Sequence, residues 1–340
     1  MGHKIAIVGA TGNVGRNVLN IISEFKDEGK ISVDSVIPLA SKKSRGKKLS
    51  FGDDEITVSC LDNYDFNGTN VVIFCARSEV SKTYVPVATT SGCIVIDNTS
   101  YFRMKEGIPL IIPEVNEEEI KKYRNNNIIS NPNCSTIQML LVLNPLHTYA
   151  KIKRIVVSTY QSTSGAGKAA MDELYNQTKK MFVNENVKPS VFTKPIAFNC
   201  IPHIEAFMED GFTLEEHKMQ EETKKILGEN IKVNATCVRV PVFVGHAESV
   251  NVEFHNSIAV EQVYKILDKT DGVLVHDRHK DGGYKTPVEV AQDDTVYVSR
   301  IRKDCTVEHG ISMWIVTDNL RKGAALNIVQ ILEILLNKYL

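Results

Sequence analysis

The chain has 340 residues, enough for two domains; 43% are hydrophobic and 24% are charged, which is typical of globular proteins and excludes disordered, collagen-like or coiled-coil chains. Lys and Arg number 40 against 41 Asp and Glu, so the formal charge of -1 creates no overall field that would attract nucleic acid or an anionic membrane. The longest apolar run, at 71–76, is far shorter than the roughly 20 residues that span a bilayer. Because no signal-peptide pattern is present at the N-terminus, we expect a cytoplasmic protein.

The first 130 residues alternate between strand and helix signals. A β-branched run at 4–8 ends in Gly9, and a helical stretch at 13–25 follows it. Further strands are predicted at 33–39, 71–75 and 94–97. Near-continuous apolar runs, each followed by a polar loop or a helix, indicate a parallel sheet covered on both faces. The predicted fold class of this half is therefore α/β.

The pattern changes after about residue 150. Longer strands separated by helical stretches indicate a mixed or antiparallel sheet with helices on one face. The final stretch, 324–339, has an amphipathic helical period and is expected to pack back on the first domain. We predict strands at 152–159, 236–244, 249–254 and 295–302, and helices at 169–183 and 214–227.

A glycine-rich segment joins the first strand to the first helix. It reads Gly9-Ala10-Thr11-Gly12-Asn13-Val14-Gly15. Glycines at such a junction permit a tight turn and let a pyrophosphate approach the N–H groups at the positive helix end. The spacing is G-x-x-G-x-x-G, and its position after an N-terminal strand favours dinucleotide binding over a purely structural turn.

The second strand is followed by a basic loop instead of an acidic residue. NAD-preferring sites usually carry an acid here that binds the ribose 2′-hydroxyl. The loop reads Ser41-Lys42-Lys43-Ser44-Arg45-Gly46-Lys47-Lys48. Its cations and hydroxyls suit a 2′-phosphate, so NADP is the predicted cofactor, with a solvated basic loop as the alternative. A single short run without interleaved aromatics does not favour nucleic-acid binding.

Seven cysteines are scattered along the chain, and no C-x-x-C metal or redox motif occurs. We expect free thiols in a reducing compartment, and no metal site. Cys134 differs from the others because Asn131-Pro132-Asn133 stops the preceding strand and places this cysteine in the first turn of an apolar helix. The positive end of a helix favours the thiolate form, so Cys134 is a candidate nucleophile.

A nucleophilic cysteine needs a general base. Of nine histidines, His246 stands out because it follows a predicted strand that ends at Gly245. Arg239 is predicted on the same strand, where its guanidinium could bind a carboxylate through two hydrogen bonds.

Five motifs in this order resemble those of the bacterial aspartate-semialdehyde dehydrogenase family: G-A-T-G-N-V-G, S-N-P-N-C-S-T, Y-Q-S-T-S-G-A-G, E-E-H-K-M and R-V-P-V-F-V-G-H. The resemblance covers about residues 4–335. It implies a glyceraldehyde phosphate dehydrogenase-like architecture, with a Rossmann-type NADP-binding domain at 1–133 and 320–340 and an α+β catalytic and dimerisation domain, built on a mixed sheet, at 134–319. The implied assembly is a homodimer or a dimer of dimers.

The implied reaction is the NADPH-dependent conversion of L-4-aspartyl phosphate into L-aspartate 4-semialdehyde, with release of phosphate. In the family this step is shared by lysine, threonine, methionine, isoleucine and diaminopimelate synthesis. By motif, Cys134 resembles the nucleophile that forms a thioacyl enzyme, His246 the acid/base group, and Gln161 the residue that orients the acyl group.

The resemblance also assigns binding residues. Arg239 matches the ligand of the substrate α-carboxylate, and Glu215 the partner of its ammonium group. Arg103, Asn133 and Lys218 match phosphate-binding positions, and Asn319 the nicotinamide-carboxamide contact. The implied cofactor-binding residues are Gly9, Thr11, Gly12, Asn13, Val14, Gly15, Ser41, Lys43, Ser44, Arg45, Ser164, Gly165 and Asn319.

One helix supports these assignments independently, and two loops depart from the family pattern. Thr213 and Glu216 fit a capping box, which leaves Glu215 and Lys218 three residues apart on one face. The cofactor loop carries Lys43 and Arg45 where the family commonly shows a single arginine, so either could bind the 2′-phosphate. Arg77 stands where small residues are usual.

Two other functions compete with this interpretation. N-acetyl-glutamyl-phosphate reductase shares the plan and the Cys/His chemistry, but its blocked amine needs no anion such as Glu215. A non-catalytic NADP-responsive regulator would keep the fold and lose the chemistry, and the joint presence of Cys134, Gln161, Arg239 and His246 argues against it.

Overall fold

In the computed structural model, which describes residues 2–340, the chain divides into two units. One unit extends to Pro132 and includes Ala324–Leu340, and the other is Asn133–Gly323. The first unit thus includes the C-terminal helix, although the whole second unit lies between this helix and the rest of the first unit in the sequence.

The first unit is built on a six-stranded sheet in the order β5-β2-β1-β6-β7-β8, with all pairs parallel. Its strands confirm the predicted α/β class and the parallel sheet. The strands are β1 (His3–Val8), β2 (Val33–Ala40), β5 (Ser59–Cys60), β6 (Val71–Phe74), β7 (Ile94–Asp97) and β8 (Ile128–Ser130).

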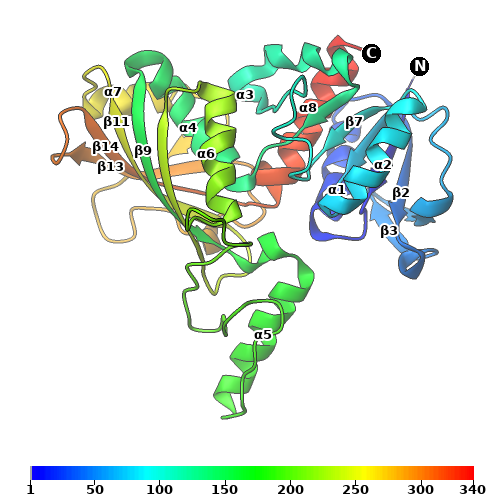
Figure 1. Cartoon of the computed structure of the whole chain (residues 1–340), viewed down its shortest axis with the longest axis horizontal. Coiled ribbons are helices and arrows are strands. Elements are labelled where there is room, and N and C mark those ends of the chain that lie inside the picture. The colour runs from blue at the N-terminus through cyan, green and yellow to red at the C-terminus, as the bar shows by residue number, and fades with distance from the viewer. Residues whose placement is uncertain (1) are drawn as a thin grey trace. The chain divides into compact units, whose positions relative to one another are not determined.

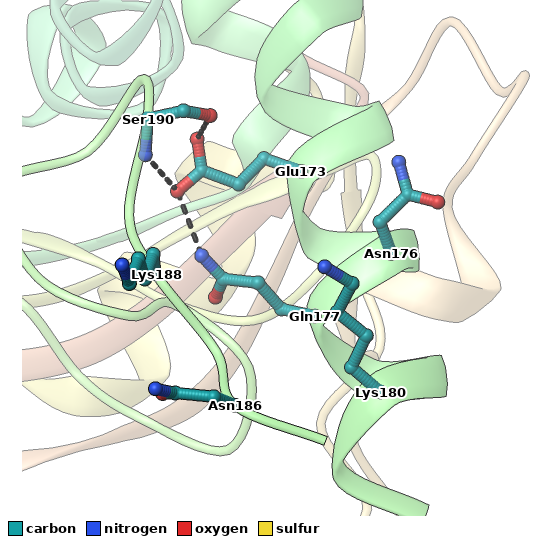
Figure 2. A pocket seen from close by; sticks show the side chains of 7 residues that line it. All are labelled: Glu173, Asn176, Gln177, Lys180, Asn186, Lys188 and Ser190. Atoms are coloured by element: carbon teal, nitrogen blue, oxygen red, sulfur yellow. Dashed lines mark hydrogen bonds between the residues drawn. The ribbon is translucent and has the colours of Figure 1, made fainter. Parts of the chain in front are cut away.

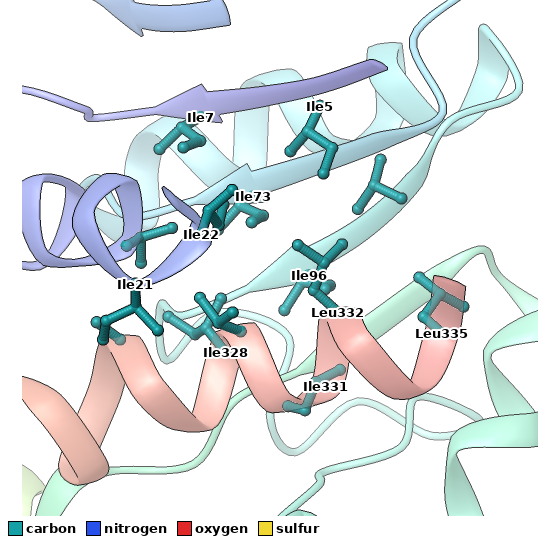
Figure 3. Packing of buried hydrophobic residues seen from close by; sticks show 14 of the residues in the cluster. Ile5, Ile7, Ile21, Ile22, Ile73, Ile96, Ile328, Ile331, Leu332 and Leu335 are labelled. Atoms are coloured by element: carbon teal, nitrogen blue, oxygen red, sulfur yellow. The ribbon is translucent and has the colours of Figure 1, made fainter. Parts of the chain in front are cut away.

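Successive residues of β1 are buried on opposite faces of this sheet. Ile5 and Ile7 pack in a core with α1 (Asn13–Asp27) and α8 (Leu326–Lys338), as Figure 3 shows. Ala6 and Val8 belong to a separate core that contains α2 (Ser78–Thr90). Burial on both faces explains why the strand reads as a continuous apolar run. The expectation that the last helix packs on the first domain is confirmed.

Shorter elements complete the first unit. A small antiparallel pair lies outside the main sheet, and helical turns connect the later strands. They are β3 (Lys48–Phe51), β4 (Asp54–Thr57), α3 (Pro113–Asn116) and the 3₁₀ segments Lys42–Ser44, Leu61–Asn63 and Glu117–Asn125.

The second unit has a six-stranded mixed sheet in the order β10-β9-β11-β14-β13-β12. The outer pairs are parallel and the inner pairs antiparallel, as expected for a mixed sheet. Helix α4 contacts α6, α7 and the central strands, so these helices form one layer over the sheet. The bounds are α4 (Cys134–Ala150), β9 (Ile152–Gln161), α5 (Lys168–Phe182), α6 (Leu214–Leu227), β10 (Lys232–Arg239), β11 (His246–Phe254), α7 (Val260–Leu267), β12 (Val273–Val275), β13 (Val296–Asp304) and β14 (Gly310–Thr317).

One predicted strand, 236–244, is wrong in a way that matters for the site. β10 ends at Arg239, residues 240–245 leave the sheet, and His246 begins β11. Pro241 has no N–H for a strand ladder, and Gly245 turns the chain at φ +96°, a conformation that disfavours any other residue. Arg239 and His246 therefore lie on different strands, and both strands flank β9.

Helix α5 extends away from the mixed sheet (Figure 1). The buried carboxylate of Glu173 holds the following loop against this helix. Glu173 accepts hydrogen bonds from Gln177 Nε2 at 2.8 Å, from the hydroxyl of Ser190 at 2.7 Å and from the N–H of Val191. Figure 2 shows this carboxylate between the helix and the loop. The loop is therefore tied to the helix by polar contacts instead of by a large apolar core.

Because α8 supplies much of one core layer, shortening one of its buried side chains should destabilise the first unit. Leu332 is fully buried, and Leu332→Ala should lower the free energy of unfolding by about 2–5 kcal/mol. Urea titration followed by far-UV circular dichroism measures this change, while the single tryptophan, Trp314, reports on the second unit. Val87→Ala, at a half-exposed position of α2, is the control and should change the free energy by less than ~0.5 kcal/mol. Equal effects of the two variants would contradict the assigned core.

Candidate active site

Cys134 is the first residue of α4, as predicted, and Asn133 caps that helix. The Asn133 side-chain oxygen accepts hydrogen bonds from the N–H groups of Ser135 at 2.9 Å and Thr136 at 3.4 Å. The cap orders the first turn and leaves the half-buried thiol at its positive end.

Helix α6 holds this cap in place from the side. Glu222 accepts the backbone N–H of Asn133 at 2.6 Å, and Glu215 accepts its side-chain amide at 2.9 Å. The predicted capping box at Thr213 and Glu216 is present, and it fixes the start of α6. The polar end of α4 is thus anchored to a second helix that is itself anchored at its first turn.

Gln161 ends β9 and is almost fully buried. Its Nε2 donates to the hydroxyl of Ser135 at 2.9 Å and to Glu215 Oε1 at 3.1 Å. Both amide hydrogens are therefore engaged, and the orientation of the carboxamide beside the Cys134 turn is set.

Glu215 and Lys218, which the sequence places on one face of α6, form an ion pair at 3.2 Å. Lys218 also pairs with Glu205. Burial alone would raise the pKa of Glu215, but Lys218 and the hydrogen bonds from Asn133 and Gln161 outweigh it and hold that pKa at about 2. Glu215 is therefore an ionised carboxylate inside the site.

Arg239 ends β10 directly opposite Gln161 of β9. It is buried, and its Nη1 donates to the carbonyl oxygen of Ser162 at 2.7 Å. Cys134 and Glu215 are among the groups that act on it electrostatically. The guanidinium thus brings a fixed positive charge close to the thiol.

His246, the first residue of β11, is fully buried. Its Nδ1 accepts a hydrogen bond from the N–H of Ser162 at 3.1 Å, which assigns the proton of the neutral ring to Nε2. Nε2 itself has no hydrogen-bond partner among residues 2–340. Burial, reinforced by Arg239, lowers the pKa of His246 to about 3, so the resting ring is neutral. It offers one unengaged N–H donor.

Two glycines mark the space around these groups. A Cβ placed on Gly165 would lie 3.2 Å from both Arg239 Nη1 and His246 Nε2. A Cβ on Gly323 would lie 3.1 Å from the Cβ of Cys134. Glycine at these two positions therefore leaves the imidazole, the guanidinium and the Cys134 side chain free of a tight contact with a neighbouring Cβ.

Asn319 ties together the loops that carry these groups. Its Oδ1 accepts hydrogen bonds from the N–H of Gly245 at 2.9 Å and the hydroxyl of Ser162 at 3.0 Å. Ser164 exchanges hydrogen bonds with the same amide at 3.0 and 3.1 Å. These bonds hold the chain at Ser162 and Ser164 and at Gly245, the residue just before His246.

The remaining predicted residues lie in the first unit. Gly9 has φ +84°, and a Cβ on Gly15 would lie 2.4 Å from the carbonyl oxygen of Gly9, so both positions require glycine. No side chain caps α1, whose N-cap is Gly12; Thr11 lies in the preceding turn, and Asn13 and Val14 are the first two residues of the helix. An uncapped helix start of this kind fits a phosphate group.

The basic loop directly follows β2, which neighbours β1 in the sheet. Lys42 and Lys48 are paired with Asp62 and Glu55, whereas Lys43 and Arg45 are exposed and form no ion pair in the described part of the chain. Ser41 and Ser44 bound the short 3₁₀ turn between them. The loop therefore offers two uncommitted cations for a phosphate.

Two further arginines lie at the carboxyl ends of neighbouring strands. Arg77 follows β6 and occupies the N-cap position of α2. Arg103 is buried and donates to the carbonyl oxygen of Asn98 at 2.8 Å. Burial raises the pKa of the nearby Asp97 to about 6, while Ser81, Thr99 and Arg103 oppose that rise.

Sequence reasoning missed Ser162 and Glu222. Ser162 lies inside the Y-Q-S-T-S-G-A-G motif, so the motif itself could have indicated it. Glu222 is two helical turns from Glu215, a spacing that places both carboxylates on one face of α6.

Within residues 2–340, no group of three or more His, Cys, Asp or Glu side chains could hold a metal ion. No helix in the described chain is long and apolar enough to cross a membrane.

Comparison with known proteins gives a consistent result. Residues 4–123 match the family described as semialdehyde dehydrogenase, NAD binding domain, and residues 143–322 match semialdehyde dehydrogenase, dimerisation domain. The chain is 50% identical over 338 residues to aspartate-semialdehyde dehydrogenase of Rickettsia bellii, and 47% identical over 341 residues to that of Aquifex aeolicus, with 99% of each chain covered.

A solved structure of Vibrio cholerae aspartate semialdehyde dehydrogenase II, described as complexed with ASA, superposes with a TM-score of 0.95 at 46% identity and 100% coverage of both chains. The parallel and mixed sheets of the two units agree with that architecture. The chain therefore belongs to the aspartate-semialdehyde dehydrogenase family.

Proposed function

We propose that this enzyme reduces L-4-aspartyl phosphate to L-aspartate 4-semialdehyde with NADPH, releases phosphate, and works through a thioacyl intermediate on Cys134. The observation that carries the proposal is the gathering, within one unit, of a helix-terminal thiol, an oriented carboxamide, a buried Arg–Glu pair of opposite charges and a neutral imidazole. The step would serve the shared branch of lysine, threonine, methionine, isoleucine and diaminopimelate synthesis. We place the enzyme in the cytoplasm, where such phosphorylated intermediates form.

In the first step the Cys134 thiolate attacks the acyl carbon of the substrate. The carbon–sulfur bond forms as the carbon–oxygen bond to phosphate breaks, and the leaving phosphate takes the bonding pair. The positive end of α4 and the guanidinium of Arg239 favour the thiolate. Lys218, Asn133 and Arg103 are the proposed phosphate ligands, and Gln161 is the group that orients the acyl carbon.

The two charged groups of the substrate backbone would select the amino acid. The Arg239 guanidinium can bind the α-carboxylate, and the ionised Glu215 can bind the α-ammonium. A substrate with a blocked amine would bring no positive charge to the buried carboxylate of Glu215 and would lose that charge-assisted contact. This charge pattern favours the aspartyl substrate over an N-acetylated one.

His246 is the proposed acid/base residue. Because Nδ1 accepts from Ser162, the Nε2–H would donate a hydrogen bond to the oxyanion of the tetrahedral thiohemiacetal, which collapses to the aldehyde as the carbon–sulfur bond breaks and the Cys134 thiolate leaves with the bonding pair. Burial and Arg239 oppose a positive charge on this ring, so His246 would remain a neutral donor while charge develops on the substrate oxygen.

NADP fits the first unit by the glycine turn and the basic loop described above. When bound, it would supply the hydride that converts the thioester to the aldehyde level. Gly9 to Gly15 would hold the pyrophosphate, and Ser41, Lys43, Ser44 and Arg45 the 2′-phosphate. Ser164, Gly165 and Asn319 remain proposed cofactor contacts, and the family's dimerisation domain supports a homodimer or a dimer of dimers.

Replacing the nucleophile should abolish turnover. In Cys134→Ser, phosphate-dependent NADP reduction with aspartate semialdehyde should fall to background because a serine hydroxyl is not ionised at neutral pH. NADP binding, measured by calorimetry, should be nearly unchanged. Acid-quenched wild type should carry an aspartyl adduct on the peptide that contains Cys134.

A second variant, His246→Asn, removes the proposed acid/base residue. It should lower kcat by roughly 10²–10⁴-fold with a much smaller change in KM. Near-normal turnover in Cys134→Ser would refute the covalent mechanism.

We expect Arg239 to recognise the substrate carboxylate by its planar geometry as well as by its negative charge. In Arg239→Lys the planar two-point contact is lost, so KM for the semialdehyde should rise sharply while KM for NADP stays constant. Steady-state kinetics with each substrate varied in turn measures both values. Glu215→Gln should reduce the discrimination between the free and the N-acetylated amine. A parallel rise of both KM values in Arg239→Lys would mean that Arg239 supports only the fold.

The unpaired cations of the cofactor loop should determine NADP preference. A charge-assisted hydrogen bond contributes about 1.5–3 kcal/mol, or roughly 10- to 150-fold in affinity. Replacing both Lys43 and Arg45 with Ala should raise KM for NADP by at least that factor and barely change KM for NAD. Single variants would identify the stronger contact.

The control is the pair Lys42→Ala and Lys48→Ala, whose side chains are already engaged by acids. Unchanged NADP preference in the Lys43/Arg45 double variant would contradict this prediction and would mean that the loop is an ordinary solvated surface.

A further inference from the structure

Two serines and an asparagine form a closed ring of hydrogen bonds beside His246. Asn319 Nδ2 donates to Ser164 Oγ at 3.0 Å, the two serine oxygens lie 3.0 Å apart, and the Ser162 hydroxyl donates back to Asn319 Oδ1 at 3.0 Å. A hydroxyl group can donate and accept at the same time, so every member has a partner. The three side chains are buried and lie within one unit. We call them the Ser–Asn ring.

The Ser–Asn ring contacts His246 and the chain just before it. Ser162 Oγ lies 3.1 Å from His246 Nδ1, and the backbone N–H of Ser162 donates to the same nitrogen at 3.1 Å. Asn319 Oδ1 also accepts the N–H of Gly245 at 2.9 Å. Because Oδ1 has two lone pairs, Gly245 and Ser162 fill it, and the Ser164 hydroxyl donates to Ser162 instead.

The backbone N–H of Ser162 has a fixed direction. The carbonyl oxygen of the same residue accepts Arg239 Nη1 at 2.7 Å, and the next N–H, that of Thr163, donates to the carbonyl oxygen of Val242 at 2.8 Å. These bonds tie the end of β9 to the chain that follows β10. The Ser162 N–H therefore points at the imidazole independently of the serine side chain.

This fixed donor leaves the buried imidazole of His246 one favourable state. With its proton on Nδ1, that nitrogen would face the Ser162 N–H, donor against donor. If the imidazole were turned by half a rotation about its Cβ–Cγ bond, a carbon would replace Nδ1, and the Ser162 N–H would lose its acceptor. Each alternative leaves a buried polar group without a partner, which destabilises it.

We propose that Ser162 is a positioning residue that keeps His246 in the orientation and tautomer with Nε2–H presented to the substrate oxyanion, and that Asn319 holds Ser162 for this role. The inference rests on the proposed function of His246. Nε2 has no hydrogen-bond partner among residues 2–340, so this N–H is the group that the arrangement presents. The amide of Asn319 has a second N–H hydrogen, so the role is compatible with its proposed cofactor contact.

The test removes the Ser162 hydroxyl and keeps the backbone N–H. Ser162→Ala opens the Ser–Asn ring and should lower kcat for phosphate-dependent NADP reduction by about 5- to 50-fold, as expected for the loss of one buried hydrogen bond. KM for NADP should stay nearly constant. Ser162→Thr restores a hydroxyl group and should keep kcat within about threefold of wild type.

Thr163→Val is the matched control because it removes a buried hydroxyl that bonds to the main chain instead of to the Ser–Asn ring. The Thr163 hydroxyl donates to the carbonyl oxygen of Val242 at 3.1 Å, and the Thr163 N–H binds the same oxygen at 2.8 Å. That oxygen keeps a partner in the variant, so kcat should stay close to the wild-type value.

A double-mutant cycle separates positioning from a general structural role. In Ser162→Ala/His246→Asn, kcat should equal that of His246→Asn alone, because the residue through which Ser162 acts is absent. Thermal unfolding followed by circular dichroism checks that each variant is folded.

NMR of enzyme labelled with ¹⁵N-histidine gives an independent readout. The chain has nine histidines, and the signals of His246 are those missing from His246→Asn. In wild type Nδ1 should be unprotonated and Nε2 protonated. The Nδ1 signal should move in Ser162→Ala and stay in place in Thr163→Val. The wild-type measurement applies even if Ser162→Ala fails to fold.

Three results would overturn the inference: equal kcat in Ser162→Ala and Thr163→Val, the same fold loss from Ser162→Ala with and without His246, or a neutral wild-type His246 with its proton on Nδ1. Turnover in Cys134→Ser would instead refute the proposed function itself. The two failures are therefore distinguishable.

Discussion

The Asn133 cap of α4 is the contact on which the candidate active site depends. One side chain satisfies two N–H groups of the helix start, and the same residue is bound by Glu215 and Glu222 from α6. The rest of α4 is largely apolar and buried under the central strands, so its axis is fixed by packing. The cap then decides where the thiol of Cys134 lies relative to the strand ends.

The mixed sheet supplies the other half of the site. Because β9 and β10 are parallel and β11 is antiparallel to β9, the end of two strands and the start of a third lie at one edge. Gln161, Arg239 and His246 occupy these three positions. A sheet with only parallel strands would not bring the start of a strand to the same edge as the ends of its neighbours.

The electrostatics of the site follow from burial combined with selective pairing. Glu215 remains ionised because Lys218 and two amides compensate its desolvation, whereas His246 remains neutral because burial and Arg239 act in the same direction. Two titratable groups of one unit are thereby held in different states: an anion and a neutral imidazole.

The sequence by itself determined the elements whose signals are local. The parallel strands, the glycine turn, the helix start at Cys134 and the capping box at Thr213 all depend on residues within a few positions of one another. Tertiary structure alone decided that Arg239 and His246 lie on separate strands, since Pro241 and Gly245 break the ladder and β9 inserts between them. It also decided the roles of Ser162 and Glu222, because their partners are 84 and 89 residues away in the chain. A pairing over such a distance leaves no periodic signal in the sequence, and only the folded sheet brings the partners together.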